Sequence, residues 1–259
     1  MNKTVLITGG AKRIGRGIAL ALAQEGYNIV IHFSESKNEA QTLEKQLRVF
    51  GVEAVCLKAN LLQDQEIDVL IDQACQKIGK ELTLLINNAS IFEEDNIQTM
   101  TMDSWDRHIY TNLKAPVFLS KAFAAQVRNC ETDNNGELLS CANIINIIDQ
   151  KVLNANPRFF TYTLAKLGLW NFTRLSAQAL GPRIRVNAIA PGPVLKAYHE
   201  TEEHYQKKRK GTLLGRGSDV NEICRAIIFI LSSPGLTGQM LSIDGGQHLE
   251  WEPIAERDS

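Results

Sequence analysis

The chain alternates between short, continuously apolar runs and longer amphipathic stretches, beginning with its first residues. The run from Thr4 to Thr8 predicts a buried strand, and the stretch from Gly15 to Glu25 predicts a helix that ends at Gly26. The same alternation continues as far as Ile243. It predicts further strands over 28–33, 53–58, 82–87, 142–148, 183–188 and 240–243. It predicts further helices over 36–50, 62–78, 102–128, 162–180 and 219–231. We expect the helix over 102–128 to bend near Pro116.

Strands that are apolar throughout are covered on both faces, which favours a parallel sheet with helices on each side. Regular alternation of strand and helix therefore predicts a doubly wound α/β fold in the Rossmann strand order. No repeat or linker divides the chain, so we expect one domain over 1–249 and a polar tail over 250–259. The stretch 192–214 is too long for a simple connection and predicts a substrate lid.

Composition excludes several classes of function. The net charge is −1 and 44% of residues are hydrophobic, so we expect no nucleic-acid surface and no membrane anchor. No signal sequence is visible, and no apolar run approaches the roughly 20 residues of a membrane span. The histidines show no metal-ligand spacing. Five scattered cysteines without a Cys-x-x-Cys pair predict reduced thiols in a cytoplasmic protein, namely Cys56, Cys75, Cys130, Cys141 and Cys224.

A glycine-rich turn joins the first predicted strand to the first predicted helix, with the sequence Thr8-Gly9-Gly10-Ala11-Lys12-Arg13-Ile14-Gly15. Glycines let the backbone turn tightly and approach a pyrophosphate, whose charge suits a helix N-terminus. A plain strand-to-helix turn is the alternative interpretation. The position of the turn directly after the first strand favours a dinucleotide site.

The end of the second strand bears on the choice of cofactor. It has the sequence His32-Phe33-Ser34-Glu35-Ser36, without an acidic residue directly at the strand end to bind a ribose 2′-hydroxyl. Lys12 and Arg13 bring positive charge to the same corner, and the two serines are able to hydrogen-bond a phosphate. These features favour NADPH, whereas an inward-pointing Glu35 carboxylate would repel its 2′-phosphate.

Tyr162 and Lys166 lie four residues apart, so on a helix they share one face. A nearby ammonium lowers the pKa of a phenol from its usual value of about 10, and such a pair handles protons in catalysis. Asp149 stands thirteen residues earlier, where an apolar strand reaches the binding edge of such a sheet. The alternatives are a solvated surface pair and an Asp that merely caps a turn.

Five motifs, taken in their order along the chain, resemble those of the short-chain dehydrogenase/reductase family, and they extend over nearly the whole chain. They are Thr8-Gly9 with Gly15, Asn87-Asn88-Ala89, Asn112, Tyr162-x-x-x-Lys166, and Val186-Asn187 with Pro191-Gly192. Arg13 and Asp149 replace the Gly and Ser of the broad family, and with Asn88-Ala89-Ser90-x-Phe92 they resemble the pteridine reductases. The ending Asp244-Gly245-Gly246-Gln247-His248-Leu249 resembles the dihydromonapterin reductases of bacteria. Glu35 departs from the pattern, because the pteridine reductases carry a basic residue there.

The resemblance implies catalytic roles for four residues. Asp149 and Tyr162 together would protonate the pterin while NADPH supplies the hydride. Lys166 would bind the nicotinamide ribose and lower the pKa of Tyr162. Asn112 would support Lys166 through a water molecule.

The resemblance also implies a binding site. Phe92 would stack on the pterin. Arg13 would face the pyrophosphate and the polar edge of the pterin, and Ser90 would contact substrate or cofactor. Asp149 and Tyr162 would also contact the substrate. Cofactor contacts would come from Gly9, Lys12, Arg13, Ile14, Gly15, His32, Ser34, Ser36, Asn60, Leu61, Asn88, Ala89, Ser90, Tyr162, Lys166, Pro191, Gly192 and Val194.

We therefore expect an NADPH-dependent reductase of a dihydropterin-type substrate, such as dihydromonapterin, dihydrobiopterin or dihydrofolate. One alternative is a carbonyl reductase acting on a ketone such as a 3-oxoacyl thioester. Another is a non-catalytic dinucleotide sensor or scaffold, against which the joint presence of Tyr162, Lys166 and Asn112 argues. Members of the family usually form tetramers, which implies a homo-oligomer.

Overall fold

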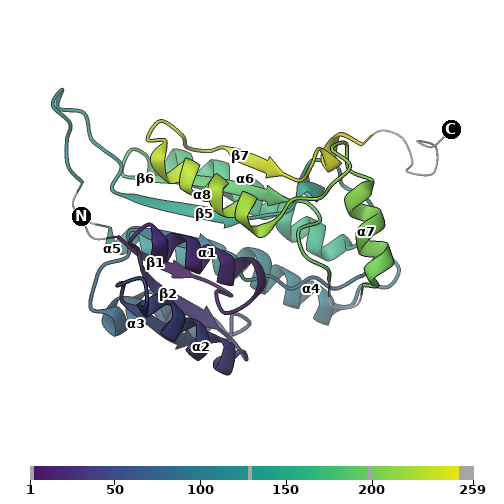
Figure 1. The fold of residues 1–259 in the computed structure, drawn as a ribbon, viewed down its shortest axis with the longest axis horizontal. Helices are drawn as coiled ribbons and strands as arrows, with labels where there is room; N and C mark the ends of the chain where they lie inside the picture. Colours follow the sequence, from purple (N-terminus) through teal and green to yellow (C-terminus); the bar gives the residue numbers. More distant parts are fainter. Residues whose placement is uncertain (1–2, 128–129, 198–199, 251–259) are drawn as a thin grey trace.

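The computed structural model describes residues 3–127, 130–197 and 200–250. One parallel sheet of seven strands has the order β3-β2-β1-β4-β5-β6-β7, which confirms the predicted α/β fold and its Rossmann strand order (Figure 1). The strands are β1 Thr4–Ile7, β2 Asn28–Phe33, β3 Ala54–Lys58, β4 Leu84–Asn87, β5 Ala142–Ile147, β6 Ile184–Pro191 and β7 Met240–Ile243. Ile7 is in register with Ile31 and with Ile86, so the carboxyl ends of the three central strands meet at one edge.

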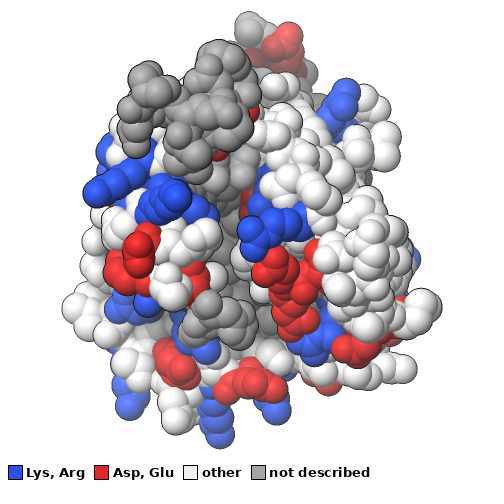
Figure 2. Space-filling model, turned by 90° about the vertical axis from the view of Figure 1, so that its right-hand side faces the viewer, with Lys and Arg blue, Asp and Glu red and all other residues white. Residues whose placement is uncertain are grey.

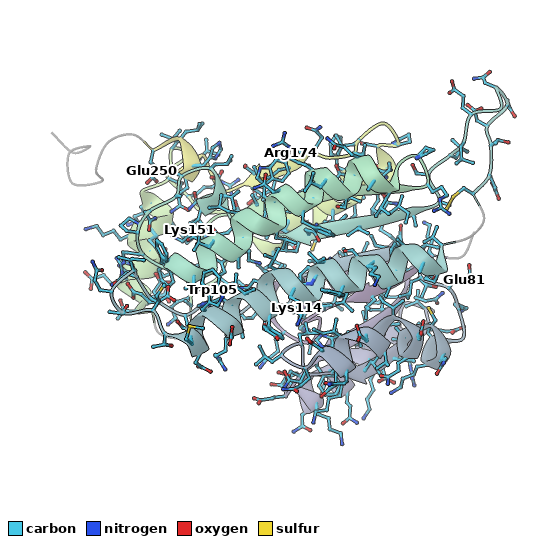
Figure 3. All side chains as sticks on the ribbon, turned by 180° about the vertical axis from the view of Figure 1, so that it is seen from behind. Glu81, Trp105, Lys114, Lys151, Arg174 and Glu250 are labelled. Carbon is cyan, nitrogen blue, oxygen red and sulfur yellow. A yellow bond between two sulfur atoms is a disulfide. The ribbon has the colours of Figure 1, made fainter. Side chains whose placement is uncertain are left out.

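Helices cover both faces of the sheet, because successive residues of each strand point to opposite sides. Val5 and Ile7 pack with α1 (Arg13–Gln24), α2 (Lys37–Arg48) and α8 (Val220–Ser232). Leu6 packs on the other side with α3 (Asp64–Ile78), α5 (Ala115–Gln126) and α6 (Phe160–Leu180), which Figure 3 shows from behind. No helix among the described residues is both long enough and apolar enough to cross a bilayer.

The predicted long helix over 102–128 is divided into three parts. Helix α4 (Met102–Ile109) passes into a wider π-helical segment, η1 (Tyr110–Lys114), and then into α5. Pro116 lies two residues after the end of η1 and lacks the backbone N–H that would continue the helical hydrogen bonds, so the irregularity precedes the proline. Single π-turns inside helices are rare and occur often at functional sites.

Two cysteines depart from the prediction of reduced thiols. Cys130 and Cys141 form a disulfide, with their Cα atoms 5.1 Å apart. An antiparallel bridge between Thr132 and Leu138 folds the intervening segment back on itself and brings its ends together. This arm projects from the body of the molecule at the upper left of Figure 1, a geometry that cysteine spacing alone did not reveal. The other cysteines, Cys56, Cys75 and Cys224, are free thiols.

Candidate active site

A cleft of about 800 Å³ opens at the carboxyl ends of the strands. Figure 2 looks onto this end of the molecule and shows basic and acidic side chains together on both sides of the opening. Ten of the predicted site residues line the cleft: Arg13, Ile14, Asn88, Ser90, Phe92, Asp149, Tyr162, Lys166, Pro191 and Gly192. The structure thus brings the predicted proton donors, the aromatic residue and the phosphate loop to one place.

Tyr162 and Asp149 are directly hydrogen-bonded in the wall of this cleft. The Tyr162 hydroxyl donates to Asp149 Oδ2 at 2.8 Å, and the backbone N–H of Lys151 donates to Asp149 Oδ1 at 2.8 Å. Asp149 lies two residues after the end of β5, whereas Tyr162 lies in the first turn of α6. The Tyr162 side chain is almost wholly buried. The pair therefore forms one proton-holding unit contributed by two elements.

The prediction that Lys166 lowers the pKa of Tyr162 is wrong for this structure. Burial, followed by the charge of Asp149 and the hydrogen bond to it, raises the pKa of Tyr162 well above its ordinary value. Burial also raises the pKa of Asp149, against the opposing effect of the Lys151 backbone N–H. Both groups therefore retain protons more strongly than they would in water.

Lys166 is buried beside the pair and bonds to the strand. Its Nζ donates to the Ile147 carbonyl at 2.9 Å and lies 5.7 Å from the centre of the Tyr162 ring. Burial lowers the pKa of Lys166 to about 8, while Asp149 acts in the opposite direction. The ammonium is therefore held over the ring of Tyr162 by the backbone of β5.

Asn112 lies in the π-helical segment η1 and is completely buried. Its side chain accepts a hydrogen bond from the Ile91 N–H at 2.9 Å and donates one to the Ile91 carbonyl at 2.9 Å. Asn112 therefore fixes the backbone between Ser90 and Phe92, two residues that line the cleft. Its support of Lys166 through a water molecule stays a prediction.

Phe92 takes part in a small aromatic cluster. Its ring stacks on Phe159 with centres 4.2 Å apart and an interplanar angle of 9°, and it meets the edge of Tyr162 at 4.8 Å. Phe159 has φ of +57°, a conformation that a bulky residue adopts only under strain. Sequence reasoning missed Phe159 and the neighbouring Lys151, whose Nζ lies 5.2 Å from the Phe159 ring centre. The spacing of three residues between Phe159 and Tyr162 is the signal that was available.

The glycine loop leaves space that only a missing side chain provides. Gly9 has φ of +60°, and a Cβ on Gly15 would lie 2.3 Å from the Gly9 carbonyl oxygen. Asn88 Nδ2 donates to the Thr8 and Gly9 carbonyls at 2.9 and 3.1 Å, and this tightens the turn. Together with the open N-terminus of α1, this cradle fits a dinucleotide pyrophosphate.

Arg13 occupies the position at which the broad family carries glycine, and its backbone keeps the glycine-like conformation with φ of +54°. Its guanidinium donates to the carbonyls of Leu195 and Lys196 at 3.3 and 2.9 Å. Arg13 therefore joins the phosphate loop to the lid. A strained backbone at such a position is typical of functional sites.

His32 is buried at the end of β2, where it connects two cofactor loops. Its Nδ1 accepts from the Gly9 N–H at 3.0 Å, and its Nε2 lies 3.0 Å from the Ala59 carbonyl. Nδ1 accepts a hydrogen bond and therefore carries no proton. The Ala59 carbonyl can only accept a hydrogen bond, so Nε2 must donate one, and the ring is neutral with its proton on Nε2. The predicted cofactor role of His32 is thus one of holding the Gly9 turn in place.

The protonation of His32 predicts an acid limit to stability. Burial lowers its pKa to about 4 in the folded protein, against about 6.5 in an unfolded chain. Between these values the unfolded state binds more protons, so the free energy of unfolding falls as the pH falls, by about 3 kcal/mol in total. We expect His32→Gln, which cannot become charged, to flatten urea-unfolding profiles measured from pH 7 to 4. An unchanged slope in this variant would contradict the assignment.

Other predicted cofactor residues surround the same loops. Ser34 is exposed after β2, and Ser36 precedes the first residue of α2. Asn60 stabilises the turn after β3 by accepting from the Leu62 N–H at 3.1 Å, and Leu61 is buried. Lys12 lies 3.8 Å from Glu39 in an exposed ion pair. Ala89 and Val194 do not line the cleft. The Ala89 N–H donates to Thr8 Oγ1, and the Val194 N–H donates to the Gly192 carbonyl.

The predicted lid over 192–214 contains helix α7 (Glu202–Lys210), none of whose described residues is buried. Hydrogen bonds attach the helix to the backbone on either side of it. Tyr205 donates to the Val194 carbonyl at 2.7 Å, and Arg209 donates to the carbonyls of Pro193 and Ser218, each at 2.8 Å. Lys208 pairs with Glu200 at 2.6 Å. Tyr198, a further residue of the predicted lid, lies outside the described residues.

Comparison with known proteins agrees with this geometry. Residues 3–207 match the family model described as short chain dehydrogenase. The chain belongs to this family. It is therefore an NAD(P)-dependent oxidoreductase with the fold that the motifs predicted.

Two crystal structures are similar over nearly the whole chain. The FolM alternative dihydrofolate reductase 1 of Brucella suis, in complex with NADP, is 40% identical with a TM-score of 0.90, over 97% of each chain. The Brucella canis protein of the same description, also with NADP, is 39% identical with a TM-score of 0.88, over 99% of this chain and 98% of that one. A 3-oxoacyl-[acyl-carrier-protein] reductase of Staphylococcus aureus is 29% identical over 96% of this chain and 99% of its own length.

Proposed function

We propose that this protein is an NADPH-dependent reductase of a dihydropterin-type substrate. The observation that carries the proposal is the hydrogen bond from Tyr162 to the Asp149 carboxylate in the cleft wall. Phe92 lies beside Tyr162 and presents an aromatic ring to the same space. The similar Brucella proteins, described as alternative dihydrofolate reductases, support this choice of substrate class.

The proposed chemistry requires a proton on a ring nitrogen when hydride reaches carbon, and the bound nicotinamide would supply that hydride. Tyr162, whose pKa is raised, retains its proton until a more basic atom arrives, and Asp149, whose pKa is also raised, takes up a proton more readily than a carboxyl in water. Asp149 would pass a proton along the hydrogen bond as Tyr162 delivers its own. Lys166 would stabilise negative charge on the phenol during the transfer.

The binding roles follow from the same cleft. Phe92 would stack on the flat heterocycle, since an aromatic face interacts well with another planar ring. Arg13 would face the polar edge of the substrate and the pyrophosphate, and Ser90 would hydrogen-bond to substrate or cofactor. Gly9 and Gly15 would leave room for the pyrophosphate. Gly192 allows close packing against Asp244, because a Cβ on Gly192 would lie 2.7 Å from Asp244 Cα.

A carbonyl reductase is the second candidate, and the Staphylococcus aureus reductase favours it. A single panel of acceptors tests both candidates: NADPH oxidation followed with dihydropterins, quinonoid pterins, folates and ketones, including a 3-oxoacyl thioester. We expect turnover with the pterins. Turnover with ketones alone would overturn the proposal in favour of the second candidate, and binding of NADPH without any turnover would favour a dinucleotide sensor.

Cofactor preference provides a separate prediction. Ser34, Ser36 and the basic Lys12 would contact the 2′-phosphate, so we expect kcat/KM to be about tenfold higher with NADPH than with NADH. Removing the charge of the exposed Glu35 by Glu35→Gln should increase kcat/KM for NADPH by about two- to fivefold and leave that for NADH unchanged. Equal kcat/KM values for the two cofactors in the wild-type protein would contradict the assignment.

We further propose that the protein is a homo-oligomer, expected to be a tetramer. Large apolar side chains remain exposed on the helices behind the sheet, with Leu175 of α6 65% exposed and Phe118 of α5 40% exposed. Association would remove such surface from water. Light scattering coupled to size-exclusion chromatography measures the number of chains directly.

A further inference from the structure

A cluster of buried polar residues lies behind the wall formed by Phe92 and Tyr162. It consists of Asp95, Ser104, His108 and Thr161, of which His108 and Thr161 are completely inaccessible to solvent, Asp95 is 5% exposed and Ser104 is half-buried. These residues come from the loop after β4, from α4 and from the first turn of α6. Helix α4, which carries the labelled Trp105 in Figure 3, lies side by side with α6 at this end of the molecule.

The hydrogen bonds within the cluster have a single consistent direction. Thr161 donates its hydroxyl proton to Asp95 Oδ2 at 2.5 Å, and Ser104 Oγ donates to the same oxygen at 3.2 Å. The Thr161 hydroxyl has only one proton, so His108 Nδ1, at 2.6 Å from that oxygen, must be the donor of the next bond. His108 Nε2 is then free to accept from the Glu93 N–H at 3.2 Å, as the structure shows.

The charges in this cluster agree with that assignment. Burial lowers the pKa of His108, which keeps its ring neutral. Burial acts to raise the pKa of Asp95, but hydrogen bonds from Thr161 and Ser104 outweigh it and keep the pKa below its ordinary value. Ionised Asp95 and neutral His108 are therefore the states that satisfy every described donor and acceptor of the cluster.

The cluster also completes the start of the helix that carries Tyr162. Helix α6 has no side-chain cap of its own, and Phe159 precedes it in a strained conformation. Asp95 Oδ1 accepts from the Thr161 N–H at 3.0 Å, and the Asp95 carbonyl accepts from the Phe160 N–H at 3.2 Å. A carboxylate at a helix N-terminus is electrostatically favourable. The loop of Phe92 is thus fastened to the helix of Tyr162 by Asp95.

We propose that Asp95, Thr161 and His108 are positioning residues that set the distance between the Phe92 ring and the Tyr162 hydroxyl. They act through the backbone on either side: Phe92 lies three residues before Asp95, and Tyr162 directly follows Thr161. The Phe92 part of this inference rests on the proposed function, whereas the Tyr162 part holds for any acceptor that this phenol protonates. None of the three residues lines the cleft, so their effect on catalysis is indirect.

The test compares two Thr-to-Val changes on one helix. Thr161→Val removes the hydroxyl from the cluster without changing the shape of the side chain. Thr163→Val is the matched control, because Thr163 is also buried and its hydroxyl has no hydrogen-bond partner among the described residues. We expect Thr161→Val to lower kcat/KM about 100-fold with unchanged affinity for NADPH, since a misplacement of about 1 Å has an effect of this size. Thr163→Val should match the wild type, and Thr161→Ser, which keeps the hydroxyl, should restore activity.

The assay uses whichever acceptor the wild-type protein reduces, so a failure of the pterin assignment and a failure of this inference give different results. Absence of pterin turnover in the wild type overturns the proposed function only. Equal kcat/KM for Thr161→Val and Thr163→Val overturns the positioning role. If Thr161→Val does not fold, nitrogen NMR of His108 in the wild-type protein decides: a proton on Nδ1 supports the cluster, and a proton on Nε2 overturns it.

Discussion

Replacing Asp149 with serine is expected to lower kcat/KM for a dihydropterin by about 10²- to 10⁴-fold, the usual contribution of a positioned proton donor. Tyr162 would lose the carboxyl group that accepts its hydrogen bond at 2.8 Å and that passes it a proton in the proposed reaction. Serine stands at this position in the broad family, so reduction of a ketone should survive the change. Stopped-flow measurement of NADPH oxidation with each acceptor gives both rates.

A second variant separates the charge of Asp149 from its shape. Asp149→Asn keeps the side-chain outline and an oxygen that accepts from the Lys151 N–H, but it cannot supply a proton. It should be as inactive toward the pterin as Asp149→Ser. A threefold change in rate corresponds to a difference below about 1 kcal/mol in activation free energy. If both variants reduce the pterin at a rate within about threefold of the wild type, Asp149 has no part in the proton transfer.

Tyr162→Phe is expected to abolish turnover while leaving the protein folded and able to bind NADPH. The ring remains to pack against Phe92, but the hydroxyl bonded to Asp149 is lost. The chemical step should slow by about 10²- to 10⁴-fold with pterin and with ketone alike, because both need a proton from this position. Single-turnover oxidation of bound NADPH isolates that step from product release.

Tyr27→Phe serves as the control for this substitution. Tyr27 lies at the opposite end of the sheet, just before β2, and packs against the core on that side. The same loss of one hydroxyl there should leave the chemical step unchanged. Normal turnover by Tyr162→Phe would place the acid elsewhere in the cleft.

Local sequence was sufficient for much of this site. The alternation of apolar strands and amphipathic helices predicted the sheet, and the carboxyl ends of its strands then had to meet at one edge. Gly9, Gly15, Tyr162 and Lys166 could be assigned because their roles depend on backbone space and helical spacing. These are properties that a short stretch of sequence determines.

Other features depend on contacts between distant segments. Lys166 is directed to the Ile147 carbonyl, and Asp149 is placed against Tyr162, so the pKa of the phenol rises where spacing alone predicted a fall. The strained Phe159 and its stack on Phe92 join residues that are far apart in the chain. The disulfide between Cys130 and Cys141 likewise depends on how the intervening segment folds back.

Helix α7 has a consequence for how the enzyme exchanges its ligands. Hydrogen bonds attach it to the backbone of residues 194 and 218, and no described residue of the helix is buried. Water can replace such polar contacts, so displacement of the helix would expose little apolar surface. In the predicted lid role of α7, the exchange of ligands in the cleft would therefore be separated energetically from the stability of the domain.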